Sequence, residues 1–267
     1  MAMGSIHIGV GGWTFEPWRG VFYPDTLKQK DELKYASRHL TCIEINGTYY
    51  SLQRRDSWRK WGEETPDGFV FTVKGSRFTT NRRVLGEAGE SIERFFGQGL
   101  EELGDKLGPL FWQFAHTKRF DPEDFEAFLK LLPRELKGRP LRHAVEPRHD
   151  SFCTPQFVDL ARRYNVAIVF ADHAKYPQIA DLTTDFVYAR LQTGSDEIET
   201  AYPAAQLDLW ASRFKTWAEG GEPEGLTKVD TAKPAPRNSR DVFAFIIHEG
   251  KVRAPAGAMA LIERVST

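Results

Sequence analysis

Short apolar runs of five or six residues recur along the chain. Runs of this length suit single strands, because helices usually extend over ten residues or more. We predict eight strands, at Ile6–Val10, Thr41–Ile45, Phe69–Lys74, Leu110–Phe114, Leu141–Glu146, Val166–Phe170, Phe186–Leu191 and Val242–Ile247. Most of these runs are separated by longer stretches with a different hydrophobic period.

Those longer stretches carry the pattern of amphipathic helices. In residues 125–132, Phe and Leu occupy positions i, i+3, i+4 and i+7, which form one face of a helix. Asp121 and Thr154 each stand directly before a proline, which is the arrangement expected of a helix N-cap and first turn. The pattern predicts a last helix over residues 255–265.

Strand and helix alternate about eight times, which predicts an α/β fold, a single (β/α)8 TIM barrel spanning residues 1–267. Residues 173–184 leave no room for a full helix, so we expect an irregular barrel with a missing or short sixth helix. The polar segment 220–241 is predicted to be an inserted loop. An open, doubly wound sheet is the rival, but residues 9–12 lack the complete dinucleotide-binding glycine motif.

Composition adds few constraints. The chain is 41% hydrophobic and 27% charged, with a net charge of -1, so no global feature favours a nucleic-acid or membrane partner. Two cysteines in 267 residues do not make a disulfide framework, and no signal peptide or membrane-spanning run is evident. We therefore expect a cytoplasmic protein, and we interpret residues 1–5 as a possible cloning remnant.

Polar residues gather where the predicted strands end. Because side chains alternate along a strand, Glu44 and Asn46 share one face of the second strand, and Arg190 lies opposite Leu191 in the seventh. The carboxyl ends of TIM-barrel strands meet at one mouth, where active sites are found. The residues predicted to line one cavity there are Glu44, Asn46, Lys74, Gln113, Glu146, Asp172, Arg190 and His248.

Ordered motifs also give the chain a family resemblance. The segments are GGWT at 11–14, WRGVFYP at 18–24, EINGTYY at 44–50, FTVK at 71–74, LGP at 107–109, EPRHDSF at 146–152 and YARL at 188–191. Together they resemble the YecE-like family, domain of unknown function 72. The resemblance implies a TIM barrel and supplies no reaction. The chain departs from the family pattern at Phe245–Glu249, where an FNN-like run is usual.

The candidate chemistry is acid–base catalysis on an anionic small molecule, including a phosphorylated one, by a hydrolase, lyase or isomerase. Glu44 and Glu146 are the candidate catalytic pair, because two carboxylates in different environments can divide the acid and base roles. Arginine and lysine at the same mouth would bind the anion, or would simply pair with those carboxylates. The candidate substrate-binding residues are Trp13, Asn46, Tyr49, Lys74, Gln113, Arg148, His149, Asp172 and Arg190.

The sequence is also compatible with other functions. A metal-dependent phosphodiesterase or endonuclease would use the basic segment 74–83 and scattered ligands, although none has a known metal-site spacing. The pairs that could contribute ligands are Glu146 with His149, Asp172 with His173, and His248 with Glu249. Cys153 near His149 could be a nucleophile, but a structural cysteine is the favoured interpretation. A non-catalytic ligand-binding module is the remaining alternative. The sequence indicates no particular cofactor or oligomeric state.

Overall fold

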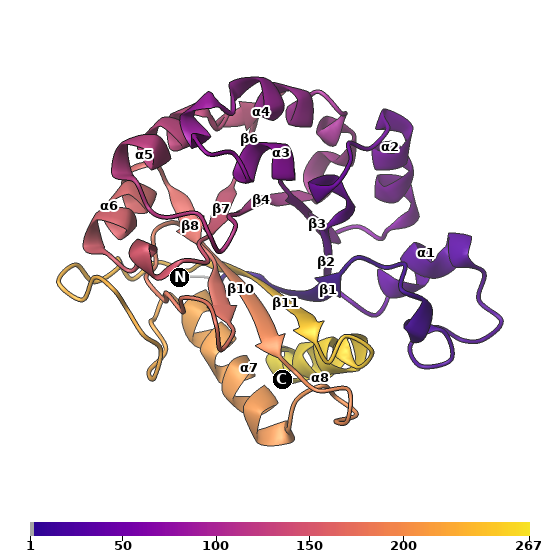
Figure 1. Ribbon diagram of the computed structural model, residues 1–267. Helices are drawn as coiled ribbons and strands as arrows, with labels where there is room; N and C mark the ends of the chain where they lie inside the picture. Colours follow the sequence, from indigo (N-terminus) through magenta and orange to yellow (C-terminus); the bar gives the residue numbers. More distant parts are fainter. Residues whose placement is uncertain (1–2) are drawn as a thin grey trace.

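The computed structural model describes residues 3–267, with the exception of the His248 side chain, and its core is one parallel sheet (Figure 1). The strand order is β8-β7-β4-β3-β2-β1-β11-β10-β9. The strands are β1 Ile6–Gly11, β2 Cys42–Ile45, β3 Val70–Lys74, β4 Leu107–Gln113, β7 His143–Glu146, β8 Val166–Ile168, β9 Phe170–Asp172, β10 Phe186–Thr193 and β11 Asp241–Glu249. A small antiparallel pair, β5 Glu135–Leu136 and β6 Arg139–Pro140, lies outside this sheet.

The sheet curls into a barrel because its two edge strands are consecutive pieces of one segment. β8 pairs with β7, β9 pairs with β10, and only Val169 separates β8 from β9. The Val169 amide still donates to the carbonyl of Val145, at 2.9 Å, so the pairing with β7 continues to this point. The predicted sixth strand, 166–170, is therefore the segment that joins the two edges. The prediction of an α/β TIM barrel is confirmed.

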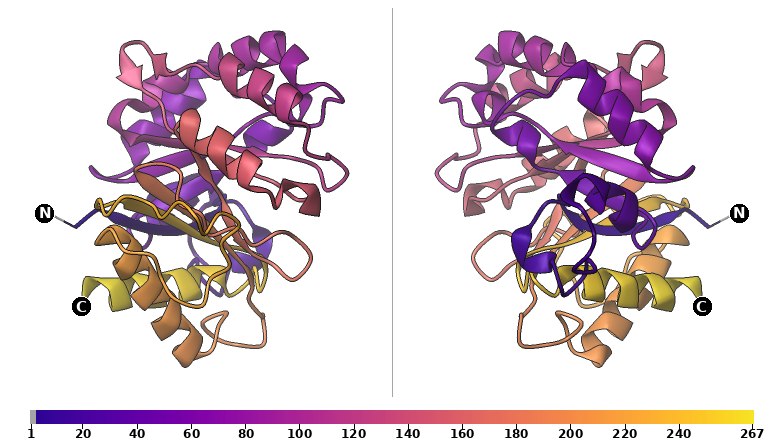
Figure 2. Two further views of the ribbon diagram at one scale, coloured as in Figure 1. Left: turned by 90° about the vertical axis from the view of Figure 1, so that its left-hand side faces the viewer. Right: turned by 90° about the vertical axis from the view of Figure 1, so that its right-hand side faces the viewer.

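Helices surround the barrel on its outside, as Figures 1 and 2 show. Their bounds are α1 Glu32–Ala36, α2 Arg55–Glu64, α3 Arg77–Thr80, α4 Gly89–Phe96, α5 Pro122–Leu131, α6 Pro155–Arg163, α7 Ala204–Ala218 and α8 Ala254–Ser266. The predicted caps are present, since the Asp121 and Thr154 side chains accept hydrogen bonds from first-turn amides of α5 and α6. None of the described helices is long and apolar enough to cross a membrane.

Two connections depart from regular strand–helix alternation. Residues 173–185, all of which are described, form no helix between β9 and β10, as the sequence predicts. Residues 219–240, also described throughout, form neither helix nor strand before β11. This second segment is held in place because the amides of Val229 and Asp230 donate to the buried carboxylate of Asp181, at 2.6 and 2.9 Å.

The alternation of side chains along the strands creates two core layers. Outward-facing residues such as Ile43 and Ile45 pack between the sheet and the helices. Inward-facing residues fill the barrel, and at its amino-terminal end they are mainly apolar and aromatic: Phe243 stacks on His7 and contacts Phe186 edge-on. Toward the carboxyl ends of the strands the interior becomes polar, and this is where the candidate site lies.

Candidate functional site

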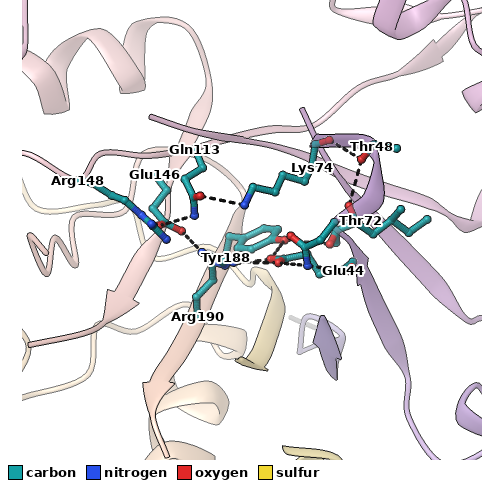
Figure 3. Close-up of polar contacts among 11 residues, drawn as sticks. Glu44, Thr48, Thr72, Lys74, Gln113, Glu146, Arg148, Tyr188 and Arg190 are labelled. Carbon is teal, nitrogen blue, oxygen red and sulfur yellow. Dashed lines mark hydrogen bonds and ion pairs between the residues drawn. The ribbon is translucent and has the colours of Figure 1, made fainter. Parts of the chain in front are cut away.

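Arg190 lies at the centre of the polar layer and joins the two glutamates (Figure 3). Its Nε and Nη2 donate to the two carboxylate oxygens of Glu44, at 3.1 and 3.0 Å. Its Nη1 donates to Oε2 of Glu146, at 2.6 Å. The guanidinium also lies over the ring of Phe111, at 4.6 Å, which covers one face of the cation with apolar surface. Planar, bidentate pairing of this kind fixes the position of an arginine.

Neither carboxylate has solvent exposure, and each accepts further hydrogen bonds. Oε1 of Glu146 accepts from Nε of Arg148, at 2.6 Å, and from Nε2 of Gln113, at 3.0 Å. Oε1 of Glu44 accepts from Nδ2 of Asn46, at 3.0 Å. Both glutamates are 0% exposed, so these bonds replace the water that the carboxylates give up on folding.

Tyr188 provides the remaining hydrogen bond to Glu44 from deeper in the barrel. It points inward because it precedes Arg190 by two residues on β10, and its hydroxyl donates to Oε2 of Glu44, at 2.7 Å. The Thr72 hydroxyl, 2.9 Å away, then donates to the tyrosine oxygen. Burial, followed by the charge of Glu44, raises the pKa of Tyr188 well above its usual value. The phenol is therefore a neutral donor in this network.

The electrostatics keep Glu146 ionised at neutral pH. Burial alone would raise the pKa of Glu146, but the charges of Arg190 and Arg148 outweigh burial and hold the pKa at about 2. In the same way, burial would lower the pKa of Arg190, and Glu146 and Glu44 outweigh it and raise the pKa. A carboxylate of such low pKa is a weak base at neutral pH, because proton transfer is most effective when the pKa lies near the working pH.

Lys74 differs from the two arginines in its surroundings. Its Nζ donates to the amide oxygen of Gln113, at 2.9 Å, and lies 4.5 Å from the ring centre of Tyr49 and 5.6 Å from that of Phe111. Among the described residues it forms no ion pair within 4.0 Å. Burial, followed by the positive charge of Arg190, lowers the pKa of Lys74 to about 8. Neutral amine and ammonium are thus both populated near neutral pH.

Above the network lies a cavity of about 430 Å³, which we call the mouth cavity. Four of its lining residues are cations, namely Lys74, Arg148, Arg190 and Lys251, and none of the described residues that line it is acidic. The two glutamates lie behind the arginines and have no exposure to the cavity. The cavity therefore presents positive charge, although the protein as a whole has a net charge of -1. Its other lining residues are Gly11, Trp18, Asn46, Tyr50, Gln113, Gln192, Ile246, Ile247 and Ala254.

The chain matches one protein-family model over nearly its whole length. A family model described as "Protein of unknown function DUF72" matches residues 7–267. The chain belongs to the DUF72 family. The family resemblance seen in the sequence motifs is thereby confirmed, and because the family is defined without a function, membership assigns no reaction.

Curated relatives of this DUF72 protein are similar over part of their length. UPF0759 protein YecE of Escherichia coli K12 is 27% identical over 150 residues, which are 55% of this chain and 50% of YecE. UPF0759 protein YunF of Bacillus subtilis 168 is 27% identical over 159 residues, or 58% of this chain and 54% of YunF. The matched region thus spans about half the length of these relatives.

Solved structures share the fold over nearly the whole chain. A DUF72 family protein from Thermotoga maritima superimposes with a TM-score of 0.74 at 23% identity, covering 98% of this chain and 100% of that one. One from Enterococcus faecalis V583 gives a TM-score of 0.72 at 15% identity, covering 98% and 96%. SacUVDE is more distant, with a TM-score of 0.54 and 9% identity over 97% and 98%. At these identities the likeness concerns the fold alone.

Most of the predicted site residues of this DUF72 protein converge at the mouth. Glu44 and Glu146 lie on either side of Arg190, and Tyr49 packs on Lys74. The predicted residues that line the mouth cavity are Asn46, Lys74, Gln113, Arg148 and Arg190. Their catalytic and binding roles stay predictions.

Three predicted residues are engaged outside the mouth cavity. Trp13 packs edge-on against Trp61 in the helix layer, with ring centres 5.0 Å apart. Asp172 accepts a hydrogen bond from the Thr193 hydroxyl, at 2.6 Å, on the outer side of the barrel. Asp172 faces outward because it follows Phe170 by two residues, and Phe170 packs against Trp210 and Trp217 of α7.

The third of these, His149, is engaged next to the mouth. Its Nδ1 accepts from the Ser151 amide, at 3.1 Å, and lies 2.9 Å from the Ser151 hydroxyl, so the ring caps the short helix Asp150–Phe152. Cys153 is exposed, and partial desolvation, followed by Asp150, raises the pKa of its thiol. Both observations disfavour a cysteine nucleophile activated by His149.

The candidate metal ligands do not converge among the described residues. No group of three or more His, Cys, Asp or Glu side chains within them is placed to hold a metal ion. Glu249 ends β11, while the side chain of His248, which was predicted to line the mouth, lies outside the described part of the structure. Glu146, the other candidate, is already enclosed by its cationic and amide donors.

Sequence reasoning missed several residues of the site. Tyr188 could have been found, because its two-residue spacing from Arg190 puts both on the inner face of β10. Trp18 ends the short 3-10 helix Glu16–Trp18, and Lys251 lies in the turn after β11. The two are far apart in the sequence, and the indole of Trp18 donates to the carbonyl of Lys251, at 2.7 Å. No strand-end pattern marks either of them, so only the folded structure brings them to the cavity.

Proposed function

We propose that this DUF72 protein is an enzyme that binds an anionic small molecule in the mouth cavity. The observation that carries the proposal is the cavity lining, in which four cations meet and no described residue is acidic. Arg148 and Arg190 are already fixed in position by Glu146 and Glu44, so little side-chain entropy would be lost when they bind a carboxylate or phosphate.

In this proposal Lys74 is the group that transfers protons, and the glutamates hold the arginines. The sequence favours Glu44 and Glu146 as acid and base, but both lie behind the arginines with no exposure, and Glu146 is a very weak base. Lys74 lines the cavity, and its pKa of about 8 suits proton exchange near neutral pH. The reaction class stays open among hydrolases, lyases and isomerases.

Inorganic phosphate is the probe that tests the proposed anion site. We expect Lys74→Met to weaken phosphate binding about tenfold, because one charge-assisted hydrogen bond contributes roughly 1.4 kcal/mol or more. Isothermal titration calorimetry at constant ionic strength measures the change. Lys130→Met is the matched control, since it removes the same charge from an exposed position on α5. Equal binding by wild type, variant and control would contradict the proposal.

A nucleic-acid substrate is the second candidate, and one observation favours it. A groove of about 670 Å³ beside α3 and the loop after β4 is lined by Arg82, Arg83, Lys118 and Arg119. Lys118 is partly neutralised by Asp124, at 2.7 Å, which lowers the positive charge available to a polyanion. DNA affinity that falls steeply with salt would favour this candidate.

Phosphate binding in the mouth cavity without any turnover would favour a non-catalytic ligand-binding module.

A further inference from the structure

Unlike the two arginines of the mouth, Lys74 forms no ion pair within 4.0 Å with any described residue. Arg148 and Arg190 both pair with Glu146, at 2.6 Å, whereas Lys74 pairs with no carboxylate among the described residues. Its one side-chain hydrogen-bond partner there, the amide oxygen of Gln113, is neutral and does not stabilise the ammonium as a carboxylate would. The ammonium is thus less stabilised than a paired lysine would be.

The position of Lys74 also gives its nitrogen access to a ligand. It is the last residue of β3 and lines the mouth cavity together with Arg148 and Arg190. The rings of Tyr49 and Phe111 lie beside the amine and exclude water from part of its surface. A lysine that is desolvated and placed near other cations is the arrangement that makes an amine nucleophilic at neutral pH.

We propose that Lys74 is a nucleophile that forms an imine with an aldehyde or ketone whose carboxylate or phosphate is bound by Arg148 and Arg190. This inference rests on the anion site of the proposed function. It narrows the anionic substrate to a carbonyl compound and gives Lys74 a covalent role in place of proton transfer. The distance between the carbonyl carbon and the anionic group would have to be short, because the three cations share one cavity of about 430 Å³.

The covalent step balances without an oxidant or a reductant. The neutral nitrogen of Lys74 attacks the carbonyl carbon, a C–N bond forms, and a proton passes from nitrogen to the former carbonyl oxygen. The resulting carbinolamine takes one further proton from solvent and loses water, which leaves a protonated C=N bond. The protonated imine draws electrons from the adjacent carbon, and this is the usual purpose of such an intermediate.

Burial and the charges around Lys74 decide how the step depends on pH. Burial has the largest effect and favours the neutral amine, as do Arg190 and Arg148, while Glu44 and Glu146 favour the ammonium. The outcome is a pKa of about 8, so attack by Lys74 should rise with pH and reach half of its maximum near pH 8. An exposed lysine, with a pKa of about 10.4, would give a profile that still rises steeply there.

Reductive trapping tests the inference with three probes. Glyoxylate carries a carboxylate, glycolaldehyde phosphate carries a phosphate, and glycolaldehyde is neutral. Cyanoborohydride delivers hydride to the imine carbon, and peptide mass spectrometry then identifies the alkylated lysine. At pH 8 we expect Lys74 to be labelled on the order of a hundredfold faster than exposed lysines, from the difference in neutral fraction. At least one anionic probe should label Lys74 faster than glycolaldehyde does, and the faster of the two identifies the anionic group.

Two controls accompany the trapping experiment: Lys251, which is the other lysine that lines the cavity, and the charge-preserving variant Lys74→Arg. Labelling mainly at Lys251, equal labelling of all lysines, or no advantage of the anionic probes would overturn the inference. Lys74→Arg retains the positive charge but cannot form an imine, so it should bind inorganic phosphate and remain unlabelled at position 74. Phosphate binding without selective labelling would overturn the imine and leave the proposed function intact. Absence of both would overturn both.

Discussion

Replacing Arg190 with methionine should lower the free energy of unfolding by about 3–5 kcal/mol. The substitution removes the cation that both carboxylates share and leaves Glu44 and Glu146 buried, at 0% exposure, with less countercharge. Breaking a buried ion pair on one side is costly because the remaining charge has neither water nor a full complement of partners. Urea unfolding followed by tryptophan fluorescence measures the change.

Two further variants separate this effect from an ordinary loss of an ion pair. Arg94→Met removes the pair with Glu90, whose partners are 71% and 70% exposed, and should change stability by less than about 1 kcal/mol. Adding Glu44→Gln and Glu146→Gln to Arg190→Met should restore part of the lost stability, because it removes the buried negative charges. If Arg190→Met lowers the free energy of unfolding no more than Arg94→Met does, Arg190 and the two glutamates do not form a coupled charge network.

Acid should destabilise the protein through Glu146 between about pH 4.5 and pH 2. The pKa of this group falls from 4.5 to about 2 on folding, because Arg190 and Arg148 outweigh the effect of burial. A lowered folded-state pKa contributes stability that is fully present above the unfolded pKa and is lost as pH falls toward the folded pKa. At neutral pH Glu146 contributes about 3 kcal/mol to the free energy of unfolding in this way, because each unit of pKa difference between the folded and unfolded states corresponds to about 1.4 kcal/mol.

Glu146→Gln isolates this contribution from other acid-sensitive carboxylates. The variant has no charge to lose at this position, so it should be less stable than wild type at pH 7, and the difference should shrink as pH falls from about 4.5 to about 2. Chemical unfolding at a series of pH values provides the comparison. A difference that stays constant across the window would show that Glu146 is not held as an anion by its cationic partners.

The sequence predicts the inner face of the barrel well because strand alternation is local. Tyr188 and Arg190 share a face of β10 by spacing alone, and both prove to lie inside the barrel. The same rule explains the outward direction of Asp172, which was wrongly expected at the mouth on the ground that it ends a strand. Counting from Phe170, which packs against Trp210 in the helix layer, puts Asp172 on the outer face. A residue at the end of a strand is therefore predicted to lie at the mouth only if it is also on the inner face of that strand.

The chemical character of the site could not be predicted, because it depends on long-range convergence. Glu44 and Arg190 are 146 residues apart in the chain, and their bidentate pairing is what takes Glu44 out of the cavity. Lys74 follows from the sequence as a strand-end cation, but that it forms no ion pair with a described residue depends on how Arg148 and Arg190 divide the available carboxylates. Loop packing is equally non-local, as Trp13 and Lys251 show.

Selenate provides a direct test of anion binding in the mouth cavity. Selenate has the shape of phosphate, and anomalous scattering at the selenium edge locates it in a crystal without ambiguity. We expect the strongest anomalous peak in the mouth cavity, within hydrogen-bond distance of Lys74 and of Arg148 or Arg190. An empty cavity in crystals whose selenate sites lie only in the groove lined by Arg82 and Lys118 would contradict it.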